Sequence, residues 1–282
     1  MKIIDGKAIS AQIRAELKAE SDKLKAEKGI TPGLAVIIVG EDPASQIYVR
    51  NKARACEELG YYSEVHRLPA ESTEEEICEL IDKLNADEKI HGILVQLPLP
   101  GHKDEKSLLL RISPEKDVDA FHPYNVGRIS TGDYGFLPCT PAGVMELIER
   151  SGISVSGKNC VVIGRSNIVG KPMAMLLINA SGTVTVCHSR TQNLAEVCRS
   201  ADILVSAVGK ADFVKADMVK EGAVVIDVGM NRNEEGKLCG DVAYGEVAPK
   251  CSYITPVPGG VGPMTITMLM RNTLYAAKTS AK

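Results

Sequence analysis

The chain has 282 residues, of which 44% are hydrophobic, and its net charge is −3 from 33 basic and 36 acidic residues. This length favours about two domains with sizeable cores. A balanced charge without long single-sign runs argues against nucleic acid and against an anionic membrane surface as partners.

Targeting signals and paired cysteines are missing from the sequence. Residues 1–6 lack the apolar core of a signal peptide, and no stretch approaches the roughly 18 apolar residues of a membrane span. The eight cysteines form no CxxC pair and mostly stand beside apolar residues, as free buried thiols do. We therefore expect a globular, soluble, cytoplasmic protein without a metal site or disulfides.

Strand and helix patterns alternate through the first half of the chain. A charged amphipathic helix is predicted from Asp5 to Gly29, and residues 34–39 are apolar on both faces, as in a central parallel strand. Such alternation favours a parallel sheet with right-handed crossovers. The other elements expected here are a helix starting near residue 43 and ending at Leu59, a strand at 64–68, a helix at 73–85 and a strand at 92–95.

The alternation lapses after Gln96, and residues 112–140 form a Pro/Gly-rich connector where we place the domain junction. Thr140 and Pro141 have the N-cap and first-turn arrangement of a helix that continues to Arg150. A second alternating series follows. Its expected elements are strands at 160–163, 183–187, 203–207 and 224–228, helices near 170–180 and 193–199, a surface hairpin at 231–240 and a closing helix at 264–278.

Residues 161–172 are typical of a strand, a glycine-bounded loop and a helix. Such a loop directs backbone N–H groups and the positive end of the helix towards one place, which suits an anion such as a pyrophosphate. The spacing is GxSxxxG rather than GxGxxG, so a purely structural turn is the alternative.

The strand at 183–187 ends without the carboxylate that NAD-binding folds place there for the adenosine ribose. Arg165 in the loop, with Ser189 and Arg190 after the strand, offers cationic and hydroxyl donors for a ribose phosphate. The sequence therefore favours NADP over NAD. The alternative is that both arginines are solvated surface groups.

Tyr48 and Lys52 are four residues apart on one helix face. Desolvation lowers the pKa of a lysine in a partly dry cleft, which makes Lys52 a candidate for proton transfer near neutral pH. A surface lysine beside a packed tyrosine is the alternative. Gln96, at a strand end, is placed to hydrogen-bond Lys52 or a ligand, or else is an exposed loop amide.

Asp119 lies in the connector, where a carboxylate can grip a planar amide-and-amine edge bidentately. Asp117 beside it is the alternative and is expected to be solvated. His122 and His188 stand in loops without an evident partner and are weaker candidates for a base. The YxxxK pattern also occurs in short-chain dehydrogenases, but there it follows the cofactor loop, so its position here argues for a separate substrate domain.

Four motifs in this order resemble the bifunctional methylenetetrahydrofolate dehydrogenase/methenyltetrahydrofolate cyclohydrolase family over essentially the whole chain. They are SQIYVRNK at 45–52, GILVQLPLP at 92–100, VIGRSNIVGKP at 162–172 and TPVPGGVGPMT at 255–265.

The resemblance implies two α/β domains with parallel sheets and an active-site cleft between them. The first would comprise residues 1–139 with the C-terminal helix at 264–282, and the second, a Rossmann-like NADP-binding domain, residues 140–263. A homodimer formed through the cofactor domain is also implied.

The implied reactions are oxidation of 5,10-methylene-tetrahydrofolate by NADP+ and hydrolysis of the 5,10-methenyl product to 10-formyl-tetrahydrofolate. These belong to the one-carbon metabolism that serves purine, histidine and methionine biosynthesis. By this analogy Lys52 is the catalytic lysine, Gln96 tunes its proton affinity, Tyr48 orients the folate and Asp119 binds the amino edge of the pterin.

The resemblance also implies binding residues, and no metal ligand. Nothing matches the formate–tetrahydrofolate ligase domain of larger relatives, so no ATP-dependent step is expected. The implied contacts are Pro258, Gly259, Gly260 and Val261 for the substrate, and Gly164, Arg165, Ser166, Ser189, Arg190 and Met230 for the cofactor.

Two alternatives stay open at this point. One is an NAD-dependent dehydrogenase without hydrolase activity, against which Arg165 argues. The other is a catalytically silent protein that binds folate or nucleotide, against which the intact Lys52, Gln96 and Asp119 argue.

Overall fold

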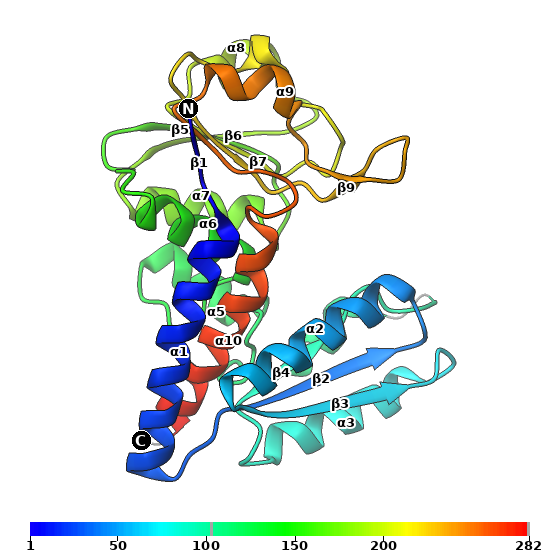
Figure 1. Ribbon diagram of the computed structural model, residues 1–282. Coiled ribbons are helices and arrows are strands. Elements are labelled where there is room, and N and C mark those ends of the chain that lie inside the picture. Colours follow the sequence, from blue (N-terminus) through cyan, green and yellow to red (C-terminus); the bar gives the residue numbers. More distant parts are fainter. Residues whose placement is uncertain (102–103, 281–282) are drawn as a thin grey trace. The chain divides into compact units, whose positions relative to one another are not determined.

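The computed structural model describes residues 1–101 and 104–280, which form two compact units (Figure 1). The six-stranded unit comprises Met1–Ala11 with Pro138–Thr265, and the three-stranded unit comprises Gln12–Leu137 with Ile266–Lys282. Both are α/β structures with parallel main sheets, as the alternating patterns predict. Two of the three boundaries between the units fall within α1 (Gly6–Lys28) and α10 (Gly262–Ser280), and the third lies between Leu137 and Pro138.

Strand β2 is the centre of the three-stranded unit, in the order β3-β2-β4. All seven of its residues are buried because helices cover both faces of the sheet, which explains its continuous apolar run. Ile77 and Ile81 of α3 pack on one face. The elements of this unit are β2 (Gly33–Val39), α2 (Pro43–Leu59), β3 (Tyr62–Leu68), α3 (Glu74–Ala86), β4 (Gly92–Val95), α4 (Glu105–Arg111) and α5 (Pro123–Thr131).

The six-stranded unit has the strand order β1-β11-β8-β7-β5-β6, with every neighbouring pair parallel. Alternate side chains of its strands, such as Val161, Leu204 and Val225, pack against residues of α8 and α9 on one face. Helices α6 and α7 lie on the other face (Figure 1). The strands are β1 (Lys2–Ile3), β5 (Asn159–Ile163), β6 (Thr183–Cys187), β7 (Ile203–Ser206), β8 (Val224–Asp227) and β11 (Tyr253–Ile254).

The remaining elements of this unit are helical or form a hairpin. The hairpin predicted at 231–240 is confirmed by the antiparallel pairing of β9 with β10. These elements are α6 (Cys139–Arg150), α7 (Gly170–Asn179), α8 (Leu194–Arg199), the 3-10 helices at Ala216–Met218 and Ala248–Lys250, β9 (Asn231–Arg232), β10 (Leu238–Cys239) and α9 (Tyr244–Val247).

The structure differs from the expectations at several places. Residues 1–11 belong with the six-stranded unit because β1 pairs with β11, whereas the sequence assigned them to the first domain. Thr140 is not an N-cap, since α6 begins at Cys139 and the Thr140 hydroxyl instead contacts that of Thr265 at 3.1 Å. The connector at 112–140 contains α5, whose first turn is formed by Pro123. Residues 281–282 of the expected C-terminal helix lie outside the described residues.

The cysteines are free thiols, and six of the eight are buried, which confirms the expectation of unpaired, mostly buried cysteines. Within residues 1–101 and 104–280, no helix combines the length and apolarity needed to cross a bilayer.

Candidate functional site

The parallel pairing of β5 with β6 sets the geometry of the expected cofactor site. Ile163 and Cys187 are register partners at the ends of these strands, and the Gly164 amide donates to the Cys187 carbonyl at 2.9 Å. The loops that follow the two strands therefore leave the same edge of the sheet side by side. This carboxyl edge is where open parallel sheets bind nucleotides.

Two glycines close the loop between β5 and α7. A side-chain carbon at Gly170 would lie 2.2 Å from the Gly164 carbonyl oxygen, and one at Gly164 would lie 2.4 Å from the Ala207 carbonyl oxygen. Gly164 also has φ +124°, which L side chains rarely adopt. The Ser166 hydroxyl accepts from the amides of Val169 and Gly170 at 3.2 and 3.3 Å, so it caps the first turn of α7. The close contacts inside the loop thus explain why its sequence has glycine, serine and glycine at this spacing.

Arg165, Ser189 and Arg190 are exposed at this edge, two or three residues beyond the ends of β5 and β6. No carboxylate stands among residues 188–191, where one would repel a ribose phosphate. The His188 ring accepts from the Arg190 amide at 3.1 Å and therefore shapes the turn. This donor set, with the N-terminus of α7 beside it, fits a dinucleotide that carries a 2′-phosphate.

A pocket of about 330 Å³ lies in the same unit, at the carboxyl end of β8. It includes Met230 and the four residues 258–261 expected to contact ligands. The side chains that sequence reasoning missed here are Lys7, Thr140, Leu238 and Thr265, whereas the strand end at Asp227 was expected at the ligand-binding edge. Asp227 ends a strand, and this position indicates a site residue. Lys7 could not be found in this way, because it reaches the pocket only through the packing of the start of α1 on this unit. That packing is so close that a side-chain carbon at Gly6 would overlap Gly260.

Asp227 is only 3% exposed, and burial raises its pKa to about 6 although three backbone amides donate to its carboxylate. Asp241, fully buried nearby, adds to the rise through like-charge repulsion. The pocket lining thus includes one buried carboxylate, whose Oδ1 accepts from the Asp241 amide at 2.9 Å.

In the three-stranded unit the structure joins two of the predicted site residues directly. The Lys52 amine donates to Oε1 of Gln96 at 3.0 Å, although the two residues are 44 positions apart. The Gln96 Nε2 donates to the Leu97 carbonyl at 2.7 Å, and this fixes the amide so that its oxygen faces Lys52. Lys52 is half-buried on α2, and Tyr48, one turn earlier on the same face, is 38% exposed.

Asp119 lies in a turn beside β4. Asp117 forms a parallel bridge with Ile93, and the chain turns directly after it, with the Ala120 amide donating to the Asp117 carbonyl at 3.0 Å. All four residues expected to act on the folate lie in the three-stranded unit: two on α2, one directly after β4 and one in this turn.

The expectation that Asp117 is solvated is wrong. It is 3% exposed and accepts hydrogen bonds from the His122 amide at 2.9 Å, the Phe121 amide at 3.3 Å and the Asn125 side chain at 2.8 Å. It thereby organises the turn that carries Asp119. The His122 ring accepts from the Tyr124 amide at 3.1 Å and so caps α5.

Metal ligands are not gathered anywhere in the part of the chain that the structure describes, since no three His, Cys, Asp or Glu side chains are grouped to hold an ion.

The difference in the free energy of unfolding between wild type and Asp117→Asn should depend on pH. Burial raises the pKa of Asp117 above its ordinary value of 3.8, so the folded chain binds this proton more tightly than the unfolded chain. Stability from this group therefore increases as the pH falls through the raised pKa towards 3.8. The wild type's free energy of unfolding, relative to that of the variant, should rise between pH 7 and pH 4.5 in urea titrations.

The matched control is Asp133→Asn, since the Asp133 carboxylate is 84% exposed in a surface ion pair and should show little pH-dependent difference. A wild-type advantage over Asp117→Asn that stays constant or shrinks on acidification would contradict the prediction.

Comparison with known proteins places this geometry in a family. Residues 4–119 match the catalytic domain, and residues 138–281 the NAD(P)-binding domain, of tetrahydrofolate dehydrogenase/cyclohydrolase. The chain is 63% identical to the bifunctional protein FolD of Moorella thermoacetica, covering 98% of this chain and 99% of that protein.

Solved structures agree with the sequence match. The bifunctional enzyme FolD of Campylobacter jejuni has a TM-score of 0.97 at 54% identity, covering 99% of each chain. The Trypanosoma brucei enzyme, solved with NADP and an inhibitor, has a TM-score of 0.94 at 43% identity, covering 99% of this chain and 98% of that one. The chain therefore belongs to the tetrahydrofolate dehydrogenase/cyclohydrolase family.

Proposed function

We propose that the chain oxidises 5,10-methylene-tetrahydrofolate with NADP+ and hydrolyses the resulting 5,10-methenyl-tetrahydrofolate to 10-formyl-tetrahydrofolate. The observation that carries this proposal is the hydrogen bond between Lys52 and Gln96, because it supplies a positioned proton carrier in the unit that matches the family's catalytic domain. Both reactions belong to one-carbon metabolism.

The first reaction requires positioning rather than acid or base chemistry. The methylene carbon loses a hydrogen with its electron pair, as a hydride, and becomes a methenyl cation. No proton transfer accompanies this step. When bound, NADP+ supplies the acceptor for this hydride. The task of Tyr48 and Asp119 is to hold the folate: the tyrosine ring packs on it, and the carboxylate accepts two hydrogen bonds from the pterin's amino edge.

The second reaction requires a proton carrier. Water adds to the methenyl carbon, the bond from that carbon to one ring nitrogen breaks, and this nitrogen gains a proton, with one proton released to solvent overall. Neutral Lys52 takes the proton of the attacking water and returns it to the departing nitrogen. Gln96 holds the amine in place, since its carbonyl oxygen accepts from both protonation states of the lysine.

Lys52→Met should abolish hydrolysis of the methenyl compound and should reduce dehydrogenase activity much less. The reason is that methionine keeps most of the side chain's length but has no group that can accept or donate a proton. Hydrolysis is followed by the decay of the intermediate's absorbance, and oxidation by NADPH formation. Loss of one general acid–base group is expected to cost about 10²- to 10⁴-fold.

The matched control for this experiment is Arg54→Met on the same helix, whose side chain is 77% exposed in an ion pair with Glu58. Full hydrolysis by Lys52→Met, or equal losses in both variants, would defeat the role assigned to Lys52.

NADP is favoured over NAD by Arg165, Ser189 and Arg190 at the carboxyl edge. Arg165→Ala should raise KM for NADP+ by about 10- to 100-fold, the effect of losing a charge-assisted hydrogen bond, and should leave KM for NAD+ nearly unchanged.

Two alternative functions make different predictions in the wild-type assay with each cofactor. Oxidation with NAD+ alone, without hydrolysis, identifies a dehydrogenase-only enzyme. Absence of any turnover identifies a silent binding protein.

A homodimer through the six-stranded unit fits the exposed edge of its sheet. Strand β6 is one of the two edge strands, Val186 on it is 38% exposed, and Ile178 on neighbouring α7 is 47% exposed. Such an edge pairs readily with a second copy. The free thiols of this chain also fit a cytoplasmic location, where cysteines are kept reduced.

Val186→Asp should convert the dimer to a monomer, because a charge would be buried in the pairing edge. Light scattering after gel filtration should change from twice the 30.2 kDa chain mass to that mass itself. Leu110→Asp, at a 41% exposed position of the three-stranded unit, is the control and should stay dimeric. A dimeric Val186→Asp variant would place the interface elsewhere.

A further inference from the structure

The hairpin after β8 presents apolar side chains to the pocket. Met230, just before β9, is 52% exposed, and Leu238 on β10 is 43% exposed, yet both line the cavity. Large apolar side chains at the mouth of a cavity favour contact with a flat or apolar part of a ligand.

Asp241 fastens the base of this hairpin. It is fully buried, and its Oδ1 accepts from the Asn231 side chain at 2.9 Å and from the Lys210 amide at 3.0 Å. Its Oδ2 accepts from the Val208 amide at 2.7 Å, with longer bonds from Gly209 and the Ser206 hydroxyl. One carboxylate thus joins the loop after β7 to the start of the hairpin.

Asp227 continues the same network at the end of β8. Its Oδ1 accepts from the Gly229 and Asp241 amides, both at 2.9 Å, and its Oδ2 accepts from the Val242 amide at 2.9 Å. Asp227 also lines the pocket. The two carboxylates together therefore fix residues 208–210, the turn before Met230 and the return of the hairpin at residue 242.

The strand order indicates which end of the cofactor reaches this place. The phosphate-binding groups follow β5 and β6, and the pocket lies at β8, which is three strands from β6 in the order β8-β7-β5-β6. At about 4.8 Å per strand this separation is about 14 Å along the carboxyl edge. A dinucleotide anchored by its adenosine phosphate therefore extends its nicotinamide end towards the pocket.

We propose that Asp227 and Asp241 are positioning residues for the dehydrogenase reaction, which hold Met230 and Leu238 as the apolar wall against the nicotinamide. This inference rests on the proposed function. In this role the carboxylates act through the backbone and through Asn231. Hydrolysis of the methenyl compound needs no cofactor, and its proposed proton carrier, Lys52, lies in the other unit, so a joint loss of both activities would indicate general destabilisation.

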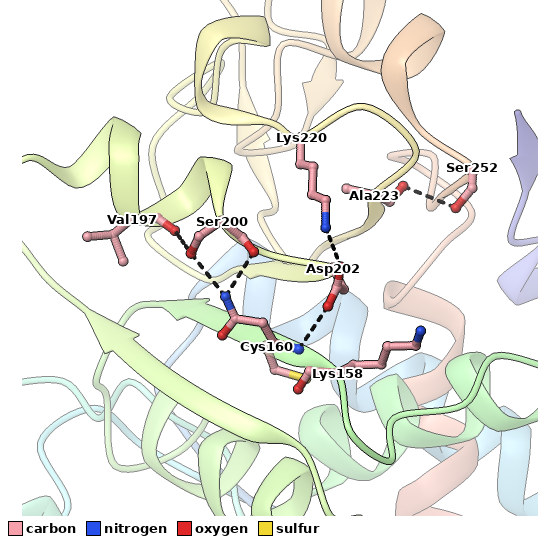
Figure 2. Close-up of polar contacts among 9 residues, drawn as sticks. Lys158, Cys160, Val197, Ser200, Asp202, Lys220, Ala223 and Ser252 are labelled. Atoms are coloured by element: carbon pink, nitrogen blue, oxygen red, sulfur yellow. Dashed lines mark hydrogen bonds and ion pairs between the residues drawn. The ribbon is translucent and has the colours of Figure 1, made fainter.

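The chain offers a matched control at the opposite, amino edge of the same sheet. There Asp202 accepts from the Asn159 amide at 3.0 Å and pairs with Lys220 at 2.6 Å, within a similar network of side-chain and backbone bonds (Figure 2). Asp202 precedes β7, whereas Asp241 binds the loop that follows it. Asp202→Asn therefore disturbs a carboxylate of this unit without touching the pocket.

The experiment compares Asp241→Asn, Asn231→Ala and Asp202→Asn with wild type, measuring KM for NADP+, dehydrogenase kcat and the rate of methenyl-tetrahydrofolate hydrolysis. Asparagine directs its NH2 group at donors, so we expect Asp241→Asn to raise KM for NADP+ about tenfold or more. Asn231→Ala leaves the carboxylate intact and removes only the hydrogen bond from the hairpin to Asp241, so it should raise KM for NADP+ by a smaller factor. Hydrolysis should stay within about twofold of wild type in all three, because its residues are untouched, and Asp202→Asn should match wild type throughout.

An unchanged KM for NADP+ in both Asp241→Asn and Asn231→Ala would overturn the inference while the proposed function stands. Parallel loss of both activities in Asn231→Ala would also overturn it, since that is the result of general destabilisation. Wild type without NADPH formation would instead overturn the proposed function, and the inference with it. A selective rise of KM in the two pocket-side variants supports the proposal.

Discussion

Register between parallel strands is the constraint on which the rest of this structure depends. The carboxyl ends of parallel strands all lie along the same side of a sheet. Residues that follow different strands therefore lie close together there without being near in sequence. The pairing of Ile163 with Cys187 brings the loops that carry Arg165 and Ser189 to the same edge, and the bridge between Ile93 and Asp117 places the turn that carries Asp119 beside β4. Each unit gathers its expected site residues by this one rule.

Buried carboxylates also stabilise this structure, and they do so by binding loops rather than strands. Asp117, Asp227 and Asp241 each accept several hydrogen bonds from loop donors, which would otherwise be unsatisfied on burial. Burial raises the pKa of Asp117 and of Asp227, and the backbone hydrogen bonds to each carboxylate oppose this rise. These hydrogen bonds connect loops that carry groups we expect to touch ligands.

The two proposed reactions make unequal demands on the chain. Hydride transfer needs a fixed cofactor, for which we propose the glycine-closed loop and the pocket at β8 of the six-stranded unit, and a fixed folate, for which we propose Tyr48 and Asp119 of the three-stranded unit. Hydrolysis needs a proton carrier, and we propose Lys52, which donates to Gln96 in the three-stranded unit. The proposed proton carrier thus lies in the match to the catalytic domain, and the expected cofactor groups lie in the match to the NAD(P)-binding domain.

The sequence by itself determined the alternation of strands and helices, the glycine loop, the absence of an acidic residue after β6 and the family, because these follow from local pattern and from motif order. It did not reveal the burial of Asp117, the reach of Lys7 into the pocket, or the network of Asp241. Each of these depends on contacts between segments distant in the chain: a loop aspartate is solvated by default until a neighbouring turn aims its amides at it. Two-residue strands such as β1 and β11 were likewise missed, since so short a pattern carries no periodicity and only pairing defines them.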